Sequence, residues 1–167
     1  MKIILTGAKG FIGSNVLKAL KSRGDYVYQI HQDKNQWEND LELENQVKNC
    51  DGIFHIGAIS DTTLQDCNEM LYWNYTLSKK LFDLARKYDK KVVYSSSAAN
   101  YGNGNGIPNN IYGWSKLLAE EYGLKACEKF IALRYFNVYG PGEEHKGKMA
   151  SVAYQAYKAG NFKLFPG

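Results

Sequence analysis

Residues 2–13 read KIILTGAKGFIG, a short apolar run that leads into three glycines at a spacing of three. The run predicts a buried strand over 2–6, and apolar residues at helical spacing over 11–22 predict a helix that ends before Gly24. A glycine-rich turn between a strand and a helix lets a pyrophosphate approach the backbone and the helix N-terminus closely. The stretch therefore predicts a dinucleotide-binding unit, with a generic glycine-rich turn as the alternative.

The rest of the chain alternates apolar strands with helices. Strands are predicted over 26–31, 52–58, 91–97 and 130–136, and helices over 43–49, 66–88, 111–126 and 147–159. Residues 32–42 are predicted to be irregular, 102–110 to form a loop, and 164–165 to begin another strand. This alternation predicts right-handed βαβ units and an α/β fold, a doubly wound parallel sheet of the Rossmann type.

The composition is that of one globular domain and excludes several classes of protein. The 167 residues are 44% hydrophobic and 23% charged, which argues against disorder. No run of 18 apolar residues could span a membrane, and the N-terminal apolar run is too short for a signal peptide, so a cytoplasmic location is expected. The net charge of +4 comes without a basic stripe, so we expect no nucleic-acid partner. Cys50, Cys67 and Cys127 form no C-x-x-C pair and predict neither disulfides nor a metal site.

A second set of residues suits acid–base chemistry. Tyr112 and Lys116 share one face of the predicted helix 111–126, and the serines at 95–97 end a strand at the edge where such sheets bind ligands. A lysine ammonium lowers the pKa of a neighbouring phenol, and a serine hydroxyl can hold an alcohol beside it. We therefore predict proton transfer coupled to hydride transfer to a nicotinamide. A surface tyrosine beside a solvated lysine is the alternative.

The end of the second predicted strand bears on the choice of cofactor. Folds that prefer NAD place an acidic residue there for the ribose 2′-hydroxyl. Here the strand ends in His31 and Gln32, followed by Asp33 and Lys34. His31 and Lys34 suit a 2′-phosphate, so the sequence favours NADP over NAD. The alternative is that Asp33 takes the acid's place, which would favour NAD.

Together these segments resemble the extended short-chain dehydrogenase/reductase superfamily, which includes the NAD-dependent nucleotide-sugar epimerases and dehydratases. The resemblance covers nearly the whole chain, and its motifs are GAKGFIG at 7–13, Asp40-Leu41, FHIGA at 54–58, Asn74, SSSAANYG at 95–102, YGWSK at 112–116 and RYFNVYGPG at 134–142. The stretch FNVYGP at 136–141, followed by EHKGKMASVA at 144–153, is similar to the ADP-glyceromanno-heptose 6-epimerase family. This similarity implies a nucleotide-sugar epimerase that oxidises and re-reduces a sugar carbinol through bound NAD(P). Another nucleotide-sugar epimerase, dehydratase or reductase, or a non-catalytic NAD(P)-binding module, is the alternative.

The resemblance also implies roles for individual residues. The implied cofactor-binding residues are Gly7, Gly10, Phe11, Ile12, Gly13, His31, Gln32, Lys34, Asp40, Leu41, Ile56, Gly57, Ala58, Ile59, Ser60, Asn74, Lys116 and Val138. The implied catalytic residues are Ser97, Tyr112, Lys116 and Lys146, of which Tyr112 and Lys146 would serve as bases on opposite sides of the carbon. The implied substrate-binding residues are Ser97, Asn137, Lys148 and Gln155.

The chain departs from the family pattern in several places. Segment 32–50 and the loop before Tyr112 are short, Lys148 stands where the family has serine, and Gly142 stands where it has arginine. The family continues well beyond the length of this chain. We therefore expect residues 1–167 to form an NAD(P)-binding Rossmann domain, with the substrate domain largely absent and residues 140–167 as the start of the substrate-binding region.

This expectation extends to the behaviour of the chain by itself. We expect it to bind NAD(P) without epimerising a sugar. Apolar side chains at Phe162, Leu164 and Phe165 are expected to favour self-association, and the sequence leaves a homo-oligomer open.

Overall fold

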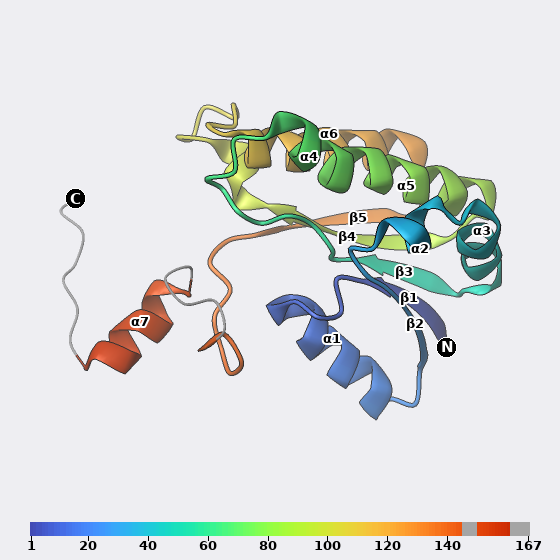
Figure 1. Cartoon of the computed structure of the whole chain (residues 1–167), viewed down its shortest axis with the longest axis horizontal. Coiled ribbons are helices and arrows are strands. Elements are labelled where there is room, and N and C mark those ends of the chain that lie inside the picture. Colours follow the sequence, from blue (N-terminus) through green and yellow to red (C-terminus); the bar gives the residue numbers. More distant parts are fainter. Residues whose placement is uncertain (145–149, 161–167) are drawn as a thin grey trace. The chain divides into compact units, whose positions relative to one another are not determined.

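The computed structural model describes residues 1–144 and 150–160, and the chain divides into two compact units, Met1–Tyr135 and Phe136–Gly167. The first unit holds a parallel five-stranded sheet in the order β2-β1-β3-β4-β5 (Figure 1). Its strands are β1 (Lys2–Thr6), β2 (Tyr26–Ile30), β3 (Gly52–His55), β4 (Lys91–Ser97) and β5 (Phe130–Tyr135).

Helices connect successive strands of this sheet. They are α1 (Phe11–Ser22), α2 (Lys34–Glu38), α3 (Asp40–Asn49), α4 (Cys67–Leu71), the π-helical turn η1 (Tyr72–Thr76), α5 (Leu77–Lys87), the 3-10 turn η2 (Ala98–Tyr101) and α6 (Ile111–Ala126). Figure 1 shows α1 on one face of the sheet and α4, α5 and α6 on the other. Helices on both faces of a parallel sheet confirm the predicted doubly wound fold.

The apolar residues of the strands point alternately to the two faces and build two cores. Ile4 and Ile53 pack with Phe82 of α5, whereas Leu5 packs with Leu20 of α1. Each large apolar side chain buried in this way stabilises the fold by about 1.5–3 kcal/mol. The carboxyl ends of the strands are thereby fixed relative to one another.

The segment predicted as irregular, 32–42, is instead largely helical, and that prediction was wrong. Asp33 and Asn39 accept hydrogen bonds from backbone N–H groups of Asn35 and Glu42, so each caps the start of a short helix. Trp37 anchors α2 because its side chain is buried and its Nε1 donates to the His31 carbonyl at 2.9 Å. A single buried aromatic gives no periodic pattern, which is why the sequence did not predict helix.

The predicted helix over 66–88 is interrupted. Residues 67–71 and 77–87 are α-helical, but the five residues of η1 between them form a π-helical turn. Such a turn contains one extra residue, which turns side chains away from their α-helical positions and often marks a functional site.

Three predicted strands end earlier than expected, at Ile30, His55 and Tyr135. After β3 the change has a visible cause, because the next two N–H groups, of Ile56 and Gly57, donate to the Thr6 hydroxyl. The Thr6 hydroxyl therefore accepts hydrogen bonds that the carbonyl groups of a neighbouring strand would otherwise accept.

The second unit contains α7 (Val152–Ala159), which follows a loop organised by Glu143. The Glu143 carboxylate is buried and accepts hydrogen bonds from the Gly140 N–H at 3.0 Å and the Ser151 hydroxyl at 2.9 Å. Ser151 also caps α7, so the helix begins later than the predicted residue 147. The predicted strand at 164–165 and the apolar side chains at 162–165 lie outside the described residues.

Within the described ranges, no helix is both long and apolar enough to cross a membrane. The same ranges contain no cluster of three His, Cys, Asp or Glu side chains suited to a metal ion. Cys50 and Cys127 are buried as free thiols, whereas Cys67 is exposed.

Candidate active site

The glycine turn after β1 is packed so tightly that two of its glycines have no room for a side chain. A Cβ on Gly7 would lie 2.6 Å from the Cα of Gly57, and a Cβ on Gly13 would lie 2.0 Å from the Gly7 carbonyl oxygen. Gly7 also has a φ of +71°, a conformation that favours glycine. These two residues are therefore required by the fold itself.

Gly10 is different from its neighbours. A Cβ on Gly10 would meet only the Gly7 carbonyl oxygen, at 3.4 Å, which is an ordinary contact. Gly10 is the N-cap of α1, but no side chain caps this helix and no acidic residue lies in its first turn. The positive end of the helix dipole is thus uncompensated, and an anion beside Gly10 would be stabilised by it.

The loop after β3 is tied to the glycine turn through buried side chains. The Thr6 hydroxyl accepts from the N–H groups of Ile56 at 3.0 Å and Gly57 at 2.8 Å and contacts His55 Nδ1 at 2.8 Å. On its other side, His55 Nε2 lies 2.7 Å from the Ser78 hydroxyl. Because Ser78 itself donates to the Asn74 carbonyl, it accepts from His55, and Thr6 donates to Nδ1. His55 is therefore the neutral tautomer with the proton on Nε2.

A second tether comes from η1. The Asn74 side chain accepts from the Ile59 N–H at 2.7 Å and donates to the Ile59 carbonyl at 2.9 Å. It also donates to the Ser115 hydroxyl of α6 at 3.0 Å. One side chain of the π-helical turn thus links the loop 56–60, which the sequence predicts to line a cofactor, to the helix that carries Tyr112 and Lys116.

His55 makes the stability of the protein dependent on pH. Burial, together with the charge of Lys116, lowers the pKa of His55 to about 3, whereas a histidine in an unfolded chain titrates near 6.5. Between these values the unfolded chain binds a proton that the folded chain does not, so acid destabilises the fold.

We expect His55→Gln to remove this contribution. Urea unfolding between pH 5 and 6.5 should show the free energy of unfolding of the wild type falling on acidification more steeply than that of the variant. One titrating group contributes at most about 1.4 kcal/mol per pH unit. His31→Gln controls for the loss of a histidine outside the core. Parallel pH dependences for the wild type and His55→Gln would contradict the assignment.

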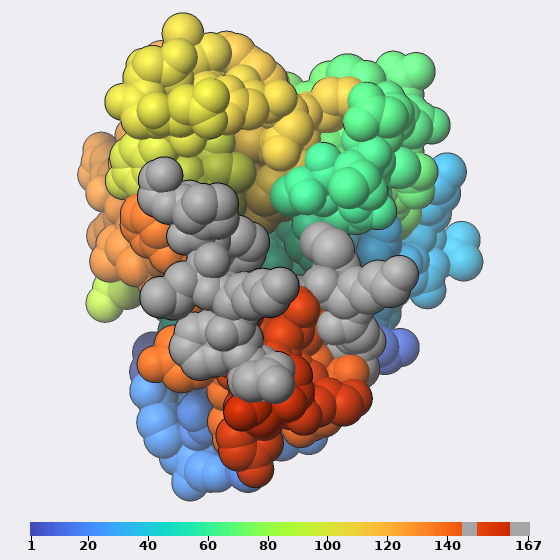
Figure 2. All heavy atoms as spheres, turned by 90° about the vertical axis from the view of Figure 1, so that its left-hand side faces the viewer, coloured from blue at the N-terminus to red at the C-terminus, as the bar shows by residue number. Residues whose placement is uncertain are grey.

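The three predicted catalytic residues of the first unit lie together at the carboxyl edge of the sheet. Ser97 ends β4, and its hydroxyl accepts from the Ala99 N–H at 3.1 Å and contacts the Tyr112 phenol. Lys116 lies one turn further along α6 and is buried, with 2% of its surface exposed. Figure 2 views this edge, with the segments that follow β3 (green) and β4 (yellow) facing the reader.

The electrostatics of this group differ from the sequence prediction. Burial raises the pKa of Tyr112, and the hydrogen bond with Ser97 opposes only part of that rise. The Lys116 ammonium lies 4.4 Å from the centroid of the Tyr94 ring. Burial lowers the pKa of Lys116 to about 7 against the opposing charge of Glu120. Lys116 is thus poised to change charge near neutrality.

The buried carboxylate of Glu120 forms hydrogen bonds with residues next to Ser97 and with Arg134. Glu120 forms a salt bridge with Arg134, at 2.7 Å from Nη2, and accepts from Asn100 at 3.0 Å and from Ser96. Burial by itself would raise the pKa of Glu120, but these donors, led by Arg134, lower it below its usual range. Through Arg134, Ser96 and Asn100, the Glu120 carboxylate joins α6 to β5, β4 and η2 close to Ser97.

The predicted adenosine-side residues follow β2. The His31 N–H donates to Gln36 Oε1 at 2.8 Å, and Asp33 is engaged as the N-cap of α2. The Lys34 ammonium lies 5.6 Å from the centroid of the Tyr72 ring. Asp40 forms an ion pair with Lys80, and Leu41 is exposed, so the adenine-side roles of these two residues remain predictions.

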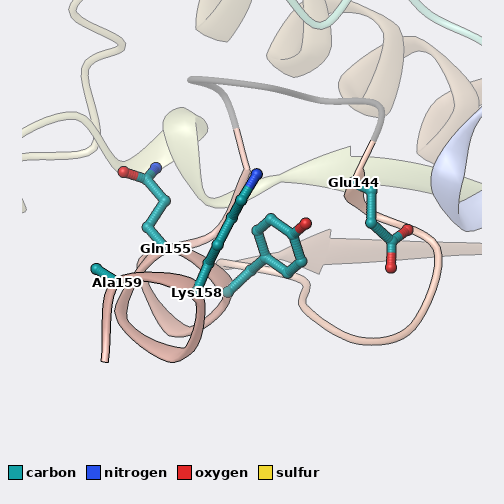
Figure 3. A pocket seen from close by; sticks show the side chains of 5 residues that line it. Glu144, Gln155, Lys158 and Ala159 are labelled. Atoms are coloured by element: carbon teal, nitrogen blue, oxygen red, sulfur yellow. The ribbon is translucent and has the colours of Figure 1, made fainter. Parts of the chain in front are cut away.

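The remaining predicted residues belong to the second unit or lie outside the described part. Gln155 Nε2 donates to the Ala150 carbonyl at 2.7 Å, and Asn137 and Val138 lie in the loop before α7. An open cavity of about 260 Å³ is lined by Glu144, Tyr154, Gln155, Lys158 and Ala159. Figure 3 shows Gln155 and Lys158 extending from α7 and Glu144 lying across from them on the preceding loop. Lys146 and Lys148 lie outside the described residues.

Sequence reasoning missed Thr6, His55, Ser115 and Glu120. Two of them carried a signal. His55 is a polar residue in the otherwise apolar run GIFHIGA at 52–58, and Glu120 follows Lys116 by one helical turn on the same face. Thr6 and Ser115 carried none, because their partners are brought together only by the fold.

The comparison with protein families agrees with this geometry. Residues 3–166 match the model of the NAD dependent epimerase/dehydratase family. The chain belongs to this family. The epimerase/dehydratase motifs identified in the sequence thus lie within a match that covers almost the whole chain.

Several curated proteins and solved structures are similar to this chain. ADP-L-glycero-D-manno-heptose-6-epimerase of Cupriavidus pinatubonensis is 36% identical over 200 aligned residues, which cover 99% of this chain and 60% of the relative. The crystal structure of Helicobacter pylori ADP-L-glycero-D-manno-heptose-6-epimerase has a TM-score of 0.83 and 32% identity, over 99% of this chain and 66% of that one. MoeE5 in complex with UDP-glucose and NAD has a TM-score of 0.72 and 28% identity, over 85% and 56% of the two chains. This chain thus spans about 60% of the length of the curated relatives it matches.

Proposed function

We propose that this chain is the cofactor-binding part of a nucleotide-sugar epimerase of the ADP-heptose 6-epimerase type. The observation that carries the proposal is the contact between Ser97 and Tyr112, with the buried Lys116 one helical turn away, at the carboxyl edge of a doubly wound sheet. Relatives named as heptose 6-epimerases over nearly the whole chain support the reaction class. Turnover, substrate and partners of the whole protein are part of the proposal.

The glycine turn fits a dinucleotide. Gly10 leaves the approach to the start of α1 open, and the uncapped helix end favours the charge of a pyrophosphate. The loop 56–60, held by Thr6 and Asn74, would lie along the same ligand. When bound, a nicotinamide cofactor supplies the acceptor and donor of the hydride.

The proton chemistry falls to the chain's own side chains. Ser97 holds the sugar alcohol beside the Tyr112 phenol, and Tyr112 takes the alcohol proton as the carbinol is oxidised. A charged Lys116 stabilises the phenolate that this step requires. Inversion needs a proton donor on the other side of the carbon, and Lys146 is our candidate for that role.

We expect Gly10→Ala to weaken dinucleotide binding at least tenfold while leaving the fold intact. The added methyl group has room within the protein, so its effect falls on a ligand that approaches the backbone. Calorimetric titration of the 167-residue chain with NAD and NADP measures the loss, and thermal unfolding checks the fold. Equal affinities for the wild type and Gly10→Ala would contradict this site.

The same titrations compare the two cofactors. Asp33 is occupied as a helix cap, and Lys34 brings a positive charge next to the end of β2. We therefore expect NADP to bind at least as tightly as NAD. Tighter binding of NAD, unchanged in Lys34→Ala, would indicate that Asp33 serves the ribose instead.

A further inference from the structure

Lys116 lies against a stack of aromatic rings in the interior of the first unit. Its Nζ is 4.4 Å from the centroid of the Tyr94 ring, and the His55 ring stacks on Tyr94 at 5.5 Å with an interplanar angle of 29°. Tyr94, His55 and Lys116 are all at most 2% exposed. The ammonium is therefore removed from water at a place where a ring face is a close neighbour.

The hydroxyl of Tyr94 does not explain why a tyrosine occupies this position. Within the described part of the chain it has no hydrogen-bond partner, although it is buried. A buried hydroxyl without a partner destabilises a fold. The useful part of Tyr94 is the ring, whose electron-rich face attracts a cation, and more strongly so where water is excluded.

We propose that Tyr94 is a positioning residue for Lys116, and that its ring face holds the ammonium at the site and keeps it charged. The inference rests on the proposed function, in which a charged Lys116 serves Tyr112. Tyr94 does not touch the reacting atoms in this proposal and acts only through Lys116.

Other groups facing Lys116 act alongside the ring. On its own helix, Glu120 favours the charged form, and Tyr112 lies one turn away. From β3, His55 is neutral above pH 3 to 4, because its pKa is about 3. The charges of Glu120 and His55 therefore stay constant over neutral and alkaline pH, and a change at Tyr94 can be measured against this constant background.

The decisive experiment weakens the ring's attraction for cations without changing its size. Tyr94→Phe removes the hydroxyl, and phenylalanines carrying one, two and three fluorines at position 94 then withdraw electron density from the ring face step by step. The titration of Lys116 is followed by NMR of ¹³C-labelled lysine in the 167-residue chain, with Lys116→Met assigning the signal.

We expect the Lys116 midpoint in Tyr94→Phe to stay close to that of the wild type and to fall progressively with fluorination. The expected fall is about 0.4–1.5 pH units at three fluorines. Tyr94→Phe should also raise Tm, because it removes the unpaired hydroxyl. A midpoint that is unchanged across the fluorinated series overturns the proposal.

This readout is independent of the proposed function. If the chain bound no dinucleotide but the midpoint fell with fluorination, the reaction would be wrong while the ring–ammonium interaction stood. If the chain bound NAD(P) but the midpoint did not move, the ring–ammonium interaction would be wrong while the proposed cofactor site stood. The series is nearly isosteric, so folding is retained even where a larger change such as Tyr94→Leu unfolds the chain.

Discussion

Replacing Tyr112 by phenylalanine is expected to lower the rate of epimerisation about 10²–10⁴-fold, the usual loss when a general base is removed. The ring and its packing are kept, and only the oxygen that contacts Ser97 is lost. Turnover is measured in a chimera in which the C-terminal remainder of the Cupriavidus relative follows Gly167. NMR detection of inversion at C6 of an ADP-heptose reports the rate, with the unmutated chimera as reference.

Binding separates this effect from misfolding. Tyr112→Phe should bind NAD(P) as the unmutated chain does, because the pyrophosphate site at Gly10 lies on a different βα turn. Tyr122→Phe is the matched control, since Tyr122 lies on the same helix and its hydroxyl bonds to Asp83 away from the site. Turnover by Tyr112→Phe at the unmutated rate would remove Tyr112 from the mechanism.

The second large effect concerns stability. Gly13→Ala is expected to destabilise the fold by about 3 kcal/mol or more, because its methyl group would lie 2.0 Å from the Gly7 carbonyl oxygen. Displacing backbone atoms costs more free energy than rotating a side chain. Relieving this overlap requires the turn or the start of α1 to shift. Thermal unfolding should show Tm lowered by roughly 6–12 °C.

Gly10→Ala in the same turn is the internal comparison for Gly13→Ala. The two substitutions add the same methyl group three residues apart, but only that at position 13 meets backbone. We expect Gly10→Ala to bind the dinucleotide more weakly with little change in Tm. For Gly13→Ala we expect the main effect to be a lower Tm. Similar Tm values for the two variants would show that the turn is less rigid than its packing indicates.

Much of the fold could be predicted because its signals are local. The apolar run 2–6, the glycine turn and the periodic helix after it define a βα unit from adjacent residues. The helices of 34–49 escaped prediction because each depends on one cap, at Asp33 or Asn39, and on Trp37, whose burial is decided by residues far along the chain. The π-helical turn likewise has no pattern of its own in the sequence.

The candidate site divides in the same way. Tyr112 and Lys116 were found because their spacing places both on one helix face, and Ser97 because it ends a strand. The interaction of Lys116 with Tyr94 was not foreseen, and neither was the rise in the pKa of Tyr112 that burial causes. Which groups a buried ammonium faces is set by tertiary packing, and a spacing of four residues does not contain that information.

The strand order has a consequence for how the chain acquires its structure. β1 is paired on both sides, yet its register places Ile3 beside Val27 of β2 and Gly52 of β3. Of the five strands, β1 is therefore translated before its partners, and it has no complete set of them until β3 has been made as well. Pairing between segments so distant along the chain closes large loops and is slow. The glycine turn that directly follows β1 is thus translated before the β3 loop, whose Gly57 packs against Gly7, and cannot reach its packed form until that loop is present.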